Sequence, residues 1–235
     1  MAELVGLARN INIDWLHAVA ECRLCGDTRQ EAAEKLNALI GLTINAKDNI
    51  RKIRTILLRI WYDADEVAWK VAEQKYRTAG ADGQLAIHWA MMLMEYPVFV
   101  DLCNVIGHMF DMRDDISTAL IREKMYEKWG ERNTLFHSLS KNIQTLKDMD
   151  ALVPMEKPGV YRNKKHIIAD EEIAGLLLCS ILKAQDKKYL SWEGFVSSPL
   201  LYPFTIVDVN ESDMVPLSFL EASRFDGTTV FSVAE

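Results

Sequence analysis

Residues 97–168 read PVFVDLCNVIGHMFDMRDDISTALIREKMYEKWGERNTLFHSLSKNIQTLKDMDALVPMEKPGVYRNKKHII, and this stretch decides the fold. It opens on Pro97, which the first turn of a helix accommodates because the missing N–H has no partner there. Apolar residues then recur at steps of three and four, which predicts helices with one buried face. Ser117 is a suitable N-cap and Gly130 a suitable terminator. We predict helices over 97–110, 118–129 and 134–149, a loop over 111–115, and only residues 131–133 between the last two helices.

The stretch ends on a pattern typical of a β-hairpin. Residues 151–154 are predicted as a short strand, 156–159 as a turn with proline and glycine, and 160–168 as a second strand. The hairpin carries several basic residues, which suits contact with phosphates. The alternative is a solvated hairpin, where exposed lysine is common. The basic residues are Lys157, Arg162, Lys164 and Lys165.

This order of helices followed by a basic ribbon, over Tyr96 to Ile168, resembles the winged helix-turn-helix superfamily of DNA-binding domains. The resemblance implies that the third helix lies in the major groove of duplex DNA and that the ribbon reaches the backbone or the minor groove. The alternative is a winged helix that docks onto another protein. The candidate residues for base edges are Asn133, Thr134, His137 and Ser138. The candidate residues for phosphates are Arg132, Lys141, Lys147, Lys157, Arg162, Lys164 and Lys165.

The rest of the chain is predicted to be mainly helical, with small β elements at the end. The helix over 84–95 is apolar on most sides, which indicates a central, buried helix. We divide the chain into a helical domain over 1–95, the winged helix-turn-helix over 96–169 and a small α+β segment over 170–235. The other expected elements are helices near 14–24, 29–40, 46–60, 65–77 and 171–183, a strand over 202–209, and a hairpin over 219–233.

A second basic run lies in the helix that we expect to be capped by Asn45. Arg51 and Lys52 belong to this run, in which Asp48 is the only acidic residue. Together with the preceding helix it forms a possible second helix-turn-helix over 28–61. The alternative interpretation is a charged, solvated helix face, and both remain open at this stage.

Charge is distributed unevenly along the chain. The net charge is −7, but residues 116–168 contain ten basic and six acidic residues, so this part carries +4 and the remainder −11. Affinity for phosphate follows the local field and not the total charge. We therefore expect double-stranded DNA as the partner of the basic part, and other protein subunits as possible partners of the acidic remainder.

Several classes of protein are disfavoured. No run of 18 apolar residues and no secretory signal occurs, so we expect a cytoplasmic protein with no membrane association. Four cysteines without a metal-binding pattern are expected to be small, buried thiols. No phosphate loop or hydrolase motif is found, so we expect no enzyme, no cofactor and no metal. Asp63, Asp65, Glu73 and Lys75 resemble a nuclease motif in spacing, but they fall in a helical pattern.

A fainter likeness covers Asn12 to Leu152. A short helix, the element from Gly26 to Glu31, a basic helix over 43–61, a buried helical pair and a winged unit follow one another in an order similar to the BrxA family. That family supplies small helical DNA-binding subunits to bacterial BREX phage-defence systems. The likeness implies a non-catalytic subunit of an antiviral assembly. A bacterial transcription regulator, with or without a small-molecule effector, and a protein-interaction scaffold remain the alternatives.

Overall fold

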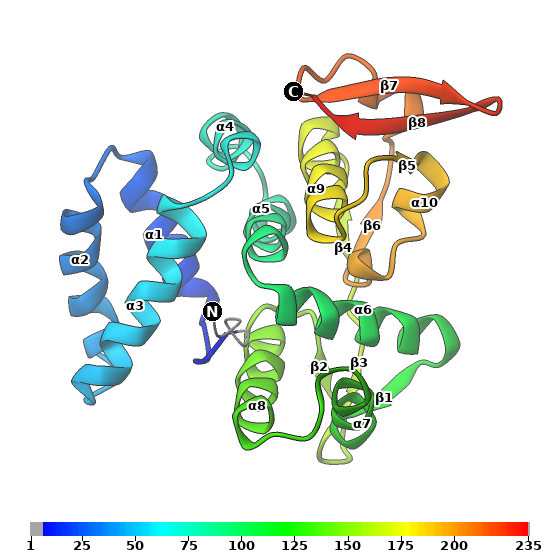
Figure 1. Cartoon of the computed structure of the whole chain (residues 1–235). Coiled ribbons are helices and arrows are strands. Elements are labelled where there is room, and N and C mark those ends of the chain that lie inside the picture. The colour runs from blue at the N-terminus through cyan, green and yellow to red at the C-terminus, as the bar shows by residue number, and fades with distance from the viewer. Residues whose placement is uncertain (1–6, 235) are drawn as a thin grey trace.

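The computed structural model describes residues 7–234, and it is mainly helical (Figure 1). Helix accounts for 60% and strand for 12%, so the prediction of a mainly α fold with small β elements is confirmed. The helices are α1 (Ile13–Leu24), α2 (Arg29–Gly41), α3 (Lys47–Tyr62), α4 (Glu66–Lys75), α5 (Ala81–Glu95), α6 (Pro97–Met112), α7 (Thr118–Trp129), α8 (Asn133–Asp148), α9 (Glu171–Ala184), α10 (Trp192–Val196), the 3-10 helix η1 (Pro199–Leu201) and α11 (Glu211–Met214). The strands are β1 (Asp115–Ser117), β2 (Val153–Pro154), β3 (Val160–Arg162), β4 (His166–Ile168), β5 (Leu190–Ser191), β6 (Phe204–Ile206), β7 (Leu220–Phe225) and β8 (Thr228–Val233).

Helices α1, α2 and α3 lie side by side at one edge of the molecule (Figure 1). Thr28 is the N-cap of α2 and forms a capping box with Glu31. Its hydroxyl oxygen accepts from the Glu31 amide, and the Glu31 carboxylate accepts from the Thr28 amide. Helix α3 buries an apolar face that runs from Ile53 to Trp61. Its predicted cap is wrong: Ala46 occupies the N-cap position, one residue after Asn45, and no side chain caps this helix.

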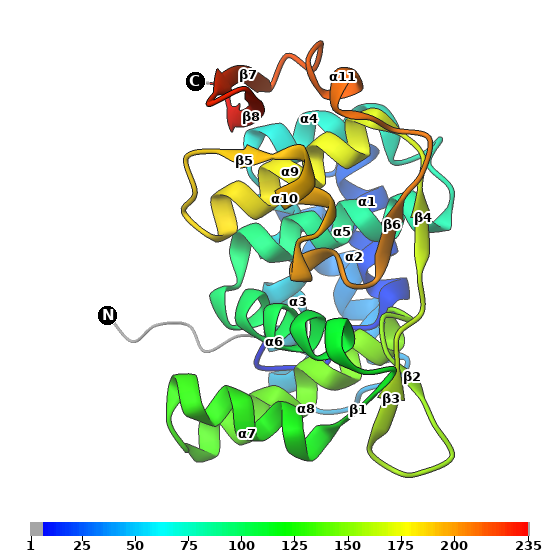
Figure 2. The same ribbon diagram turned by 90° about the vertical axis from the view of Figure 1, so that its right-hand side faces the viewer.

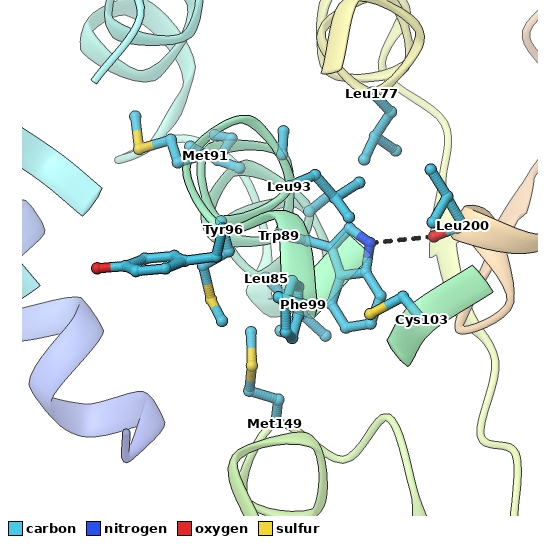
Figure 3. Packing of buried hydrophobic residues seen from close by; sticks show 14 of the residues in the cluster. Leu85, Trp89, Met91, Leu93, Tyr96, Phe99, Cys103, Met149, Leu177 and Leu200 are labelled. Atoms are coloured by element: carbon cyan, nitrogen blue, oxygen red, sulfur yellow. Dashed lines mark hydrogen bonds between the residues drawn. The ribbon is translucent and has the colours of Figure 1, made fainter. Parts of the chain in front are cut away.

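Helix α5 runs through the centre and is buried on most sides, as its composition predicted. It packs against α9, which also belongs to the core. Figure 3 shows Trp89 of α5 reaching across to Leu200, where the indole N–H donates to the carbonyl oxygen over 3.1 Å. The buried hydrophobic residues form one cluster that runs through all three predicted segments of the chain. Helix α5 therefore ties the N-terminal helices to the C-terminal elements.

A buried polar chain joins α1, α3, α4 and α5. The Trp61 indole N–H donates to His88 Nδ1 over 3.1 Å, which places the His88 proton on Nε2. His88 Nε2 lies 3.0 Å from the Tyr76 hydroxyl, and that hydroxyl lies 2.6 Å from His17 Nδ1. Each donor thus meets one acceptor with all rings neutral. His88 is thus a fully buried histidine with both ring nitrogens in hydrogen bonds.

Residues 97–162 form a compact unit at one end of the molecule (Figure 2). Its three antiparallel strands have the order β1-β3-β2, with Ile116 opposite Tyr161 and Pro154 opposite the same tyrosine. The predicted loop over 111–115 is partly wrong, because α6 continues to Met112 and β1 begins at Asp115. Gly130 ends α7 with φ +75° and ψ 157°, a conformation open only to glycine.

The predicted second strand of the hairpin, residues 160–168, is wrong as a single strand. Strand β3 ends at Arg162, and the chain then leaves the unit to form β4, which pairs in parallel with β6. The Tyr202 carbonyl oxygen redirects the chain, because it accepts from Asn163 Nδ2 over 2.6 Å and from Lys165 Nζ over 2.7 Å. The His166 amide then donates to the Pro203 carbonyl over 2.7 Å. The hairpin proper therefore ends before Asn163.

The C-terminal part contains α9 and a three-stranded sheet in which β8 is the central strand. Strands β7 and β8 form the predicted hairpin, and β5 pairs with the other edge of β8. Asp226 and Gly227 turn the hairpin with φ values of 50° and 80°, as a tight two-residue turn requires. The strand predicted over 202–209 is shorter, since β6 covers only Phe204–Ile206.

No single helix among residues 7–234 is long and apolar enough to cross a membrane. Helices α5 and α6 meet the length and composition requirements only when they are taken together, and a bend of 118° separates them.

Candidate nucleic-acid interface

The N-terminal half of α8 presents an exposed polar face. Asn133, Thr134, His137 and Lys141 are all exposed, and their spacing of three to four residues places them along one side of the helix. Arg132 precedes them as the N-cap, and its side chain makes no capping bond. Within residues 7–234, the Arg132 and Lys141 side chains have no carboxylate partner within ion-pair distance. These five residues are therefore available to a ligand at the start of α8.

Ser138 was predicted to share that face, and this prediction is wrong. It is 5% exposed and points toward the segment before α1, with its hydroxyl 3.4 Å from the Leu7 carbonyl oxygen. Asn142 donates to the same carbonyl over 3.2 Å, and Thr145 accepts from the Ile11 amide over 2.9 Å. The buried side chains of Ser138, Asn142 and Thr145 thus attach α8 to the N-terminal segment. Ser138 is therefore inaccessible to a base edge.

The hairpin of β2 and β3 projects from the same end of the molecule as α7 and α8 (Figure 2). Its turn carries Lys157, which is exposed and has no ion-pair partner among the described residues. Arg162 at the end of β3 is also exposed and donates to Asp115 of β1 over 2.6 Å. The Thr118 amide donates to the Gly159 carbonyl over 2.8 Å, which anchors the hairpin to the start of α7.

The remaining predicted cations lie apart from this hairpin. Lys164 pairs with Asp150 over 2.5 Å, and Lys147 donates to Gln144 over 3.0 Å. Lys165 donates to the Tyr202 carbonyl, and burial lowers the pKa of its ammonium. The prediction that Lys164 and Lys165 line the hairpin is therefore wrong, because both follow the point at which the chain leaves it.

A cation that forms an exposed ion pair remains a candidate for contact with a DNA phosphate. In the pairs Arg162–Asp115 and Lys164–Asp150 every side chain is at least 43% exposed, and such pairs contribute little stability. A phosphate can replace the carboxylate at low cost. Among the predicted cations, the side chains of Arg132, Lys141 and Lys157 have neither a carboxylate nor another hydrogen-bond partner within residues 7–234.

The second basic run is largely occupied by contacts of its own. Arg51 and Lys52 both pair with Asp48, over 2.7 and 2.5 Å. The side chains of all three residues are at least 41% exposed, so the desolvation that would raise the pKa of Asp48 is outweighed by the hydrogen bonds from Lys52 and Arg51. These two hydrogen bonds hold the pKa of Asp48 down to about 2. Helices α2 and α3 pack against each other, as the possible second helix-turn-helix requires. On their basic face, however, Arg51 and Lys52 are already paired with Asp48.

Sequence reasoning missed two residues of this surface, Phe136 of α8 and Arg122 of α7. Phe136 is 37% exposed, and the Arg122 guanidinium of α7 lies 4.3 Å from the centre of its ring. An exposed aromatic ring beside His137 at the start of the helix is a surface on which a base or sugar can pack. The signal in the sequence was the lone aromatic residue within a polar helix face.

The residues with nuclease-like spacing point to separate partners. Asp63 pairs with Arg29, Asp65 with Lys183, and Lys75 with Asp170. Across the described residues, no group of three or more histidine, cysteine or acidic side chains is arranged to hold a metal ion. Of the four cysteines, three are buried as predicted, and Cys25 is exposed, contrary to that prediction.

Comparison with known proteins adds no relative. No protein-family model, no curated protein and no solved structure matches this chain.

Proposed function

We propose that this protein binds duplex DNA without catalysing a reaction, through a winged helix-turn-helix made of α6, β1, α7, α8, β2 and β3. The observation that carries the proposal is the placement of α8. A three-residue connection at Gly130–Arg132 brings it close behind α7, and its exposed polar start lies at the same end of the molecule as the hairpin of β2 and β3. A helix and a basic ribbon in this relation suit the major groove and the flanking backbone.

The contacts follow from the side chains that remain available. Asn133, Thr134 and His137 have the hydrogen-bonding groups that read base edges, and the amide groups at the start of α8 favour a phosphate. Arg132, Lys141 and Lys157 supply phosphate contacts, with Arg162 and Lys164 able to exchange their carboxylates for phosphate. Ser138 and Lys165 take no part.

The proposal covers two biological roles that share this physics. A transcription regulator binds a particular site, often a palindrome read by a dimer, whereas a subunit of a phage-defence assembly binds duplex DNA with little sequence preference. Titration with one random duplex and a selected pool of duplexes separates the two roles.

Charge reversal on the proposed surface tests the function. Lys141→Glu together with Lys157→Glu removes two phosphate contacts and adds two repulsive charges. The matched control is Lys187→Glu with Lys188→Glu, since both lysines are exposed and lie in the connection after α9. With a fluorescein-labelled duplex, anisotropy should show at least about tenfold weaker binding for the first variant and little change for the control. Equal affinities for the two variants would refute the proposed surface.

A second candidate function is a protein-interaction scaffold. It is favoured by the ion pairs on Arg162 and Lys164 and by two exposed aromatic side chains in the C-terminal part, Phe225 at 75% and Tyr189 at 59% exposure. Exposed apolar groups of this size mark docking surfaces. A parent protein that shows no retention of duplex DNA at low salt supports this candidate instead.

A further inference from the structure

A pocket of about 520 Å³ lies behind the hairpin, and Arg162 is the one residue in its lining that is also proposed to contact DNA. Its walls come from the end of α6, the connection between β3 and β4, and the segment from α10 to η1. Its volume falls within the range of small-molecule sites. The residues that carry the argument are Phe110, Arg113, Asn163, Lys165, Ser198 and Tyr202.

Two cations face this pocket without a carboxylate bound to them. The Arg113 guanidinium has no hydrogen bond or ion pair to any residue between 7 and 234. Lys165 uses its ammonium on a single neutral group, the Tyr202 carbonyl oxygen at 2.7 Å. Burial of Lys165 lowers its pKa, which means that a nearby anion would relieve an existing electrostatic cost. A third cation, Arg162, borders the pocket but is held by Asp115.

Two neutral polar side chains, Asn163 and Ser198, also line the pocket. Asn163 Nδ2 donates to the Tyr202 carbonyl oxygen, while Asn163 Oδ1 is enclosed by protein atoms and has no hydrogen-bond partner among residues 7–234. Ser198 adds a hydroxyl to the same wall.

Two acidic residues narrow the chemistry of the ligand. Asp111 and Asp114 line the pocket, so the lining holds three basic and two acidic side chains. A bare polyanion gains little from such a lining. Carboxylates accept hydrogen bonds from sugar hydroxyls, whereas arginine and lysine hold phosphate. The arrangement therefore suits a molecule with one phosphate and a hydroxylated organic part.

An aromatic wall completes the site. Phe110 is half-buried and packs on Tyr202 with ring centres 5.7 Å apart and planes inclined by 31°. Rings in this setting provide a flat apolar surface for a planar group. A nucleobase is such a group, and a sugar phosphate alone would leave this wall uncovered.

From these observations we propose that the pocket binds a nucleoside monophosphate, with its phosphate on Arg113 and Lys165, its ribose hydroxyls toward Asp111 and Asp114, and its base against Phe110. The site does not depend on DNA binding by α8.

Isothermal titration calorimetry tests the proposal with defined probes. They are the four ribonucleoside 5′-monophosphates, ribose 5-phosphate, inorganic phosphate and the unphosphorylated nucleosides. We expect at least one monophosphate to bind with a Kd on the order of 1 mM or tighter, and its nucleoside at least about tenfold more weakly. No binding by any monophosphate overturns the proposal, as does tighter binding of inorganic phosphate than of every nucleotide.

Variants locate the site and separate the two proposals. Arg113→Met, alone and combined with Lys165→Met, should weaken nucleotide binding by about tenfold or more while duplex DNA affinity stays unchanged. The control Lys141→Met with Lys157→Met should show the reverse. Because Arg113 and Lys165 are both exposed, the single and the double variant are expected to keep the fold. Parent-like nucleotide binding by Arg113→Met refutes the site, whereas loss of DNA binding by both sets of variants refutes its independence from the DNA surface.

Discussion

Below pH 6.5 the protein is expected to lose stability, because His88 cannot accept a proton where it lies. The side chain is fully buried, and burial holds its pKa well below the ordinary value of 6.5, with the neighbouring His17 adding to the effect. In the unfolded chain the same histidine titrates near its ordinary value. Between these two pKa values the unfolded state binds a proton that the folded state does not. The free energy of unfolding therefore falls as the pH falls through this window.

The magnitude follows from the width of the window. One histidine that stays neutral in the folded state lowers the stability by about 1.4 kcal/mol per pH unit. Between pH 6.5 and 5.0, His88 alone accounts for about 2 kcal/mol. His17 acts in the same direction, since burial lowers its pKa while Asp14 and Glu21 oppose the shift.

The assay compares urea unfolding of the parent and of His88→Gln at pH 7.5 and 5.0. Glutamine retains an acceptor for the Trp61 indole N–H and a donor for the Tyr76 hydroxyl, but it does not titrate. The parent should lose about 2 kcal/mol more than the variant over this interval. The same pH dependence in both proteins would show that His88 does not carry the effect and would refute the reasoning.

Three further substitutions probe the packing that positions the proposed sites. A Cβ added at Gly107 would lie 2.1 Å from the Pro199 carbonyl oxygen, so Gly107→Ala should force α6 and η1 apart and cost about 1–3 kcal/mol in urea unfolding; an unchanged midpoint contradicts this close approach. Trp89→Phe leaves the Leu200 carbonyl without its donor and should cost about 1–3 kcal/mol, measured the same way, and a neutral result excludes that hydrogen bond. Gly130→Ala should cost about 1–3 kcal/mol because of its φ of +75° and ψ of 157°, and it should weaken DNA binding because it displaces the start of α8. A stable variant with parent affinity would show that the connection tolerates a different conformation.

The helices were predictable because their signals are local. Apolar spacing, the cap at Ser117 and the break at Gly130 are each contained within a few residues, and the structure places α7 over Thr118–Trp129 as expected. The C-terminal hairpin was also predictable, since Asp226-Gly227 is a strong turn signal between two alternating runs.

Three of the errors share one physical origin, which is contact between distant parts of the chain. Strand β1 exists because Ile116 pairs with Tyr161, and no short window of sequence contains that pairing. Ser138 was assigned to the exposed face because the approach of Leu7 has no local signal. Lys165 was placed on the hairpin because only the Tyr202 carbonyl, far along the chain, shows where the chain turns away.

The salt dependence of binding to a random duplex tests the central proposal most directly. Arg132, Lys141 and Lys157 lack carboxylate partners among residues 7–234, so at least three phosphate contacts are expected. Three contacts give a slope of about −2.7 for log affinity against log salt, or roughly 40-fold weaker binding at 200 mM than at 50 mM. A slope near zero, or no binding at 50 mM salt, would contradict the account of α8 and the hairpin as a DNA-binding surface.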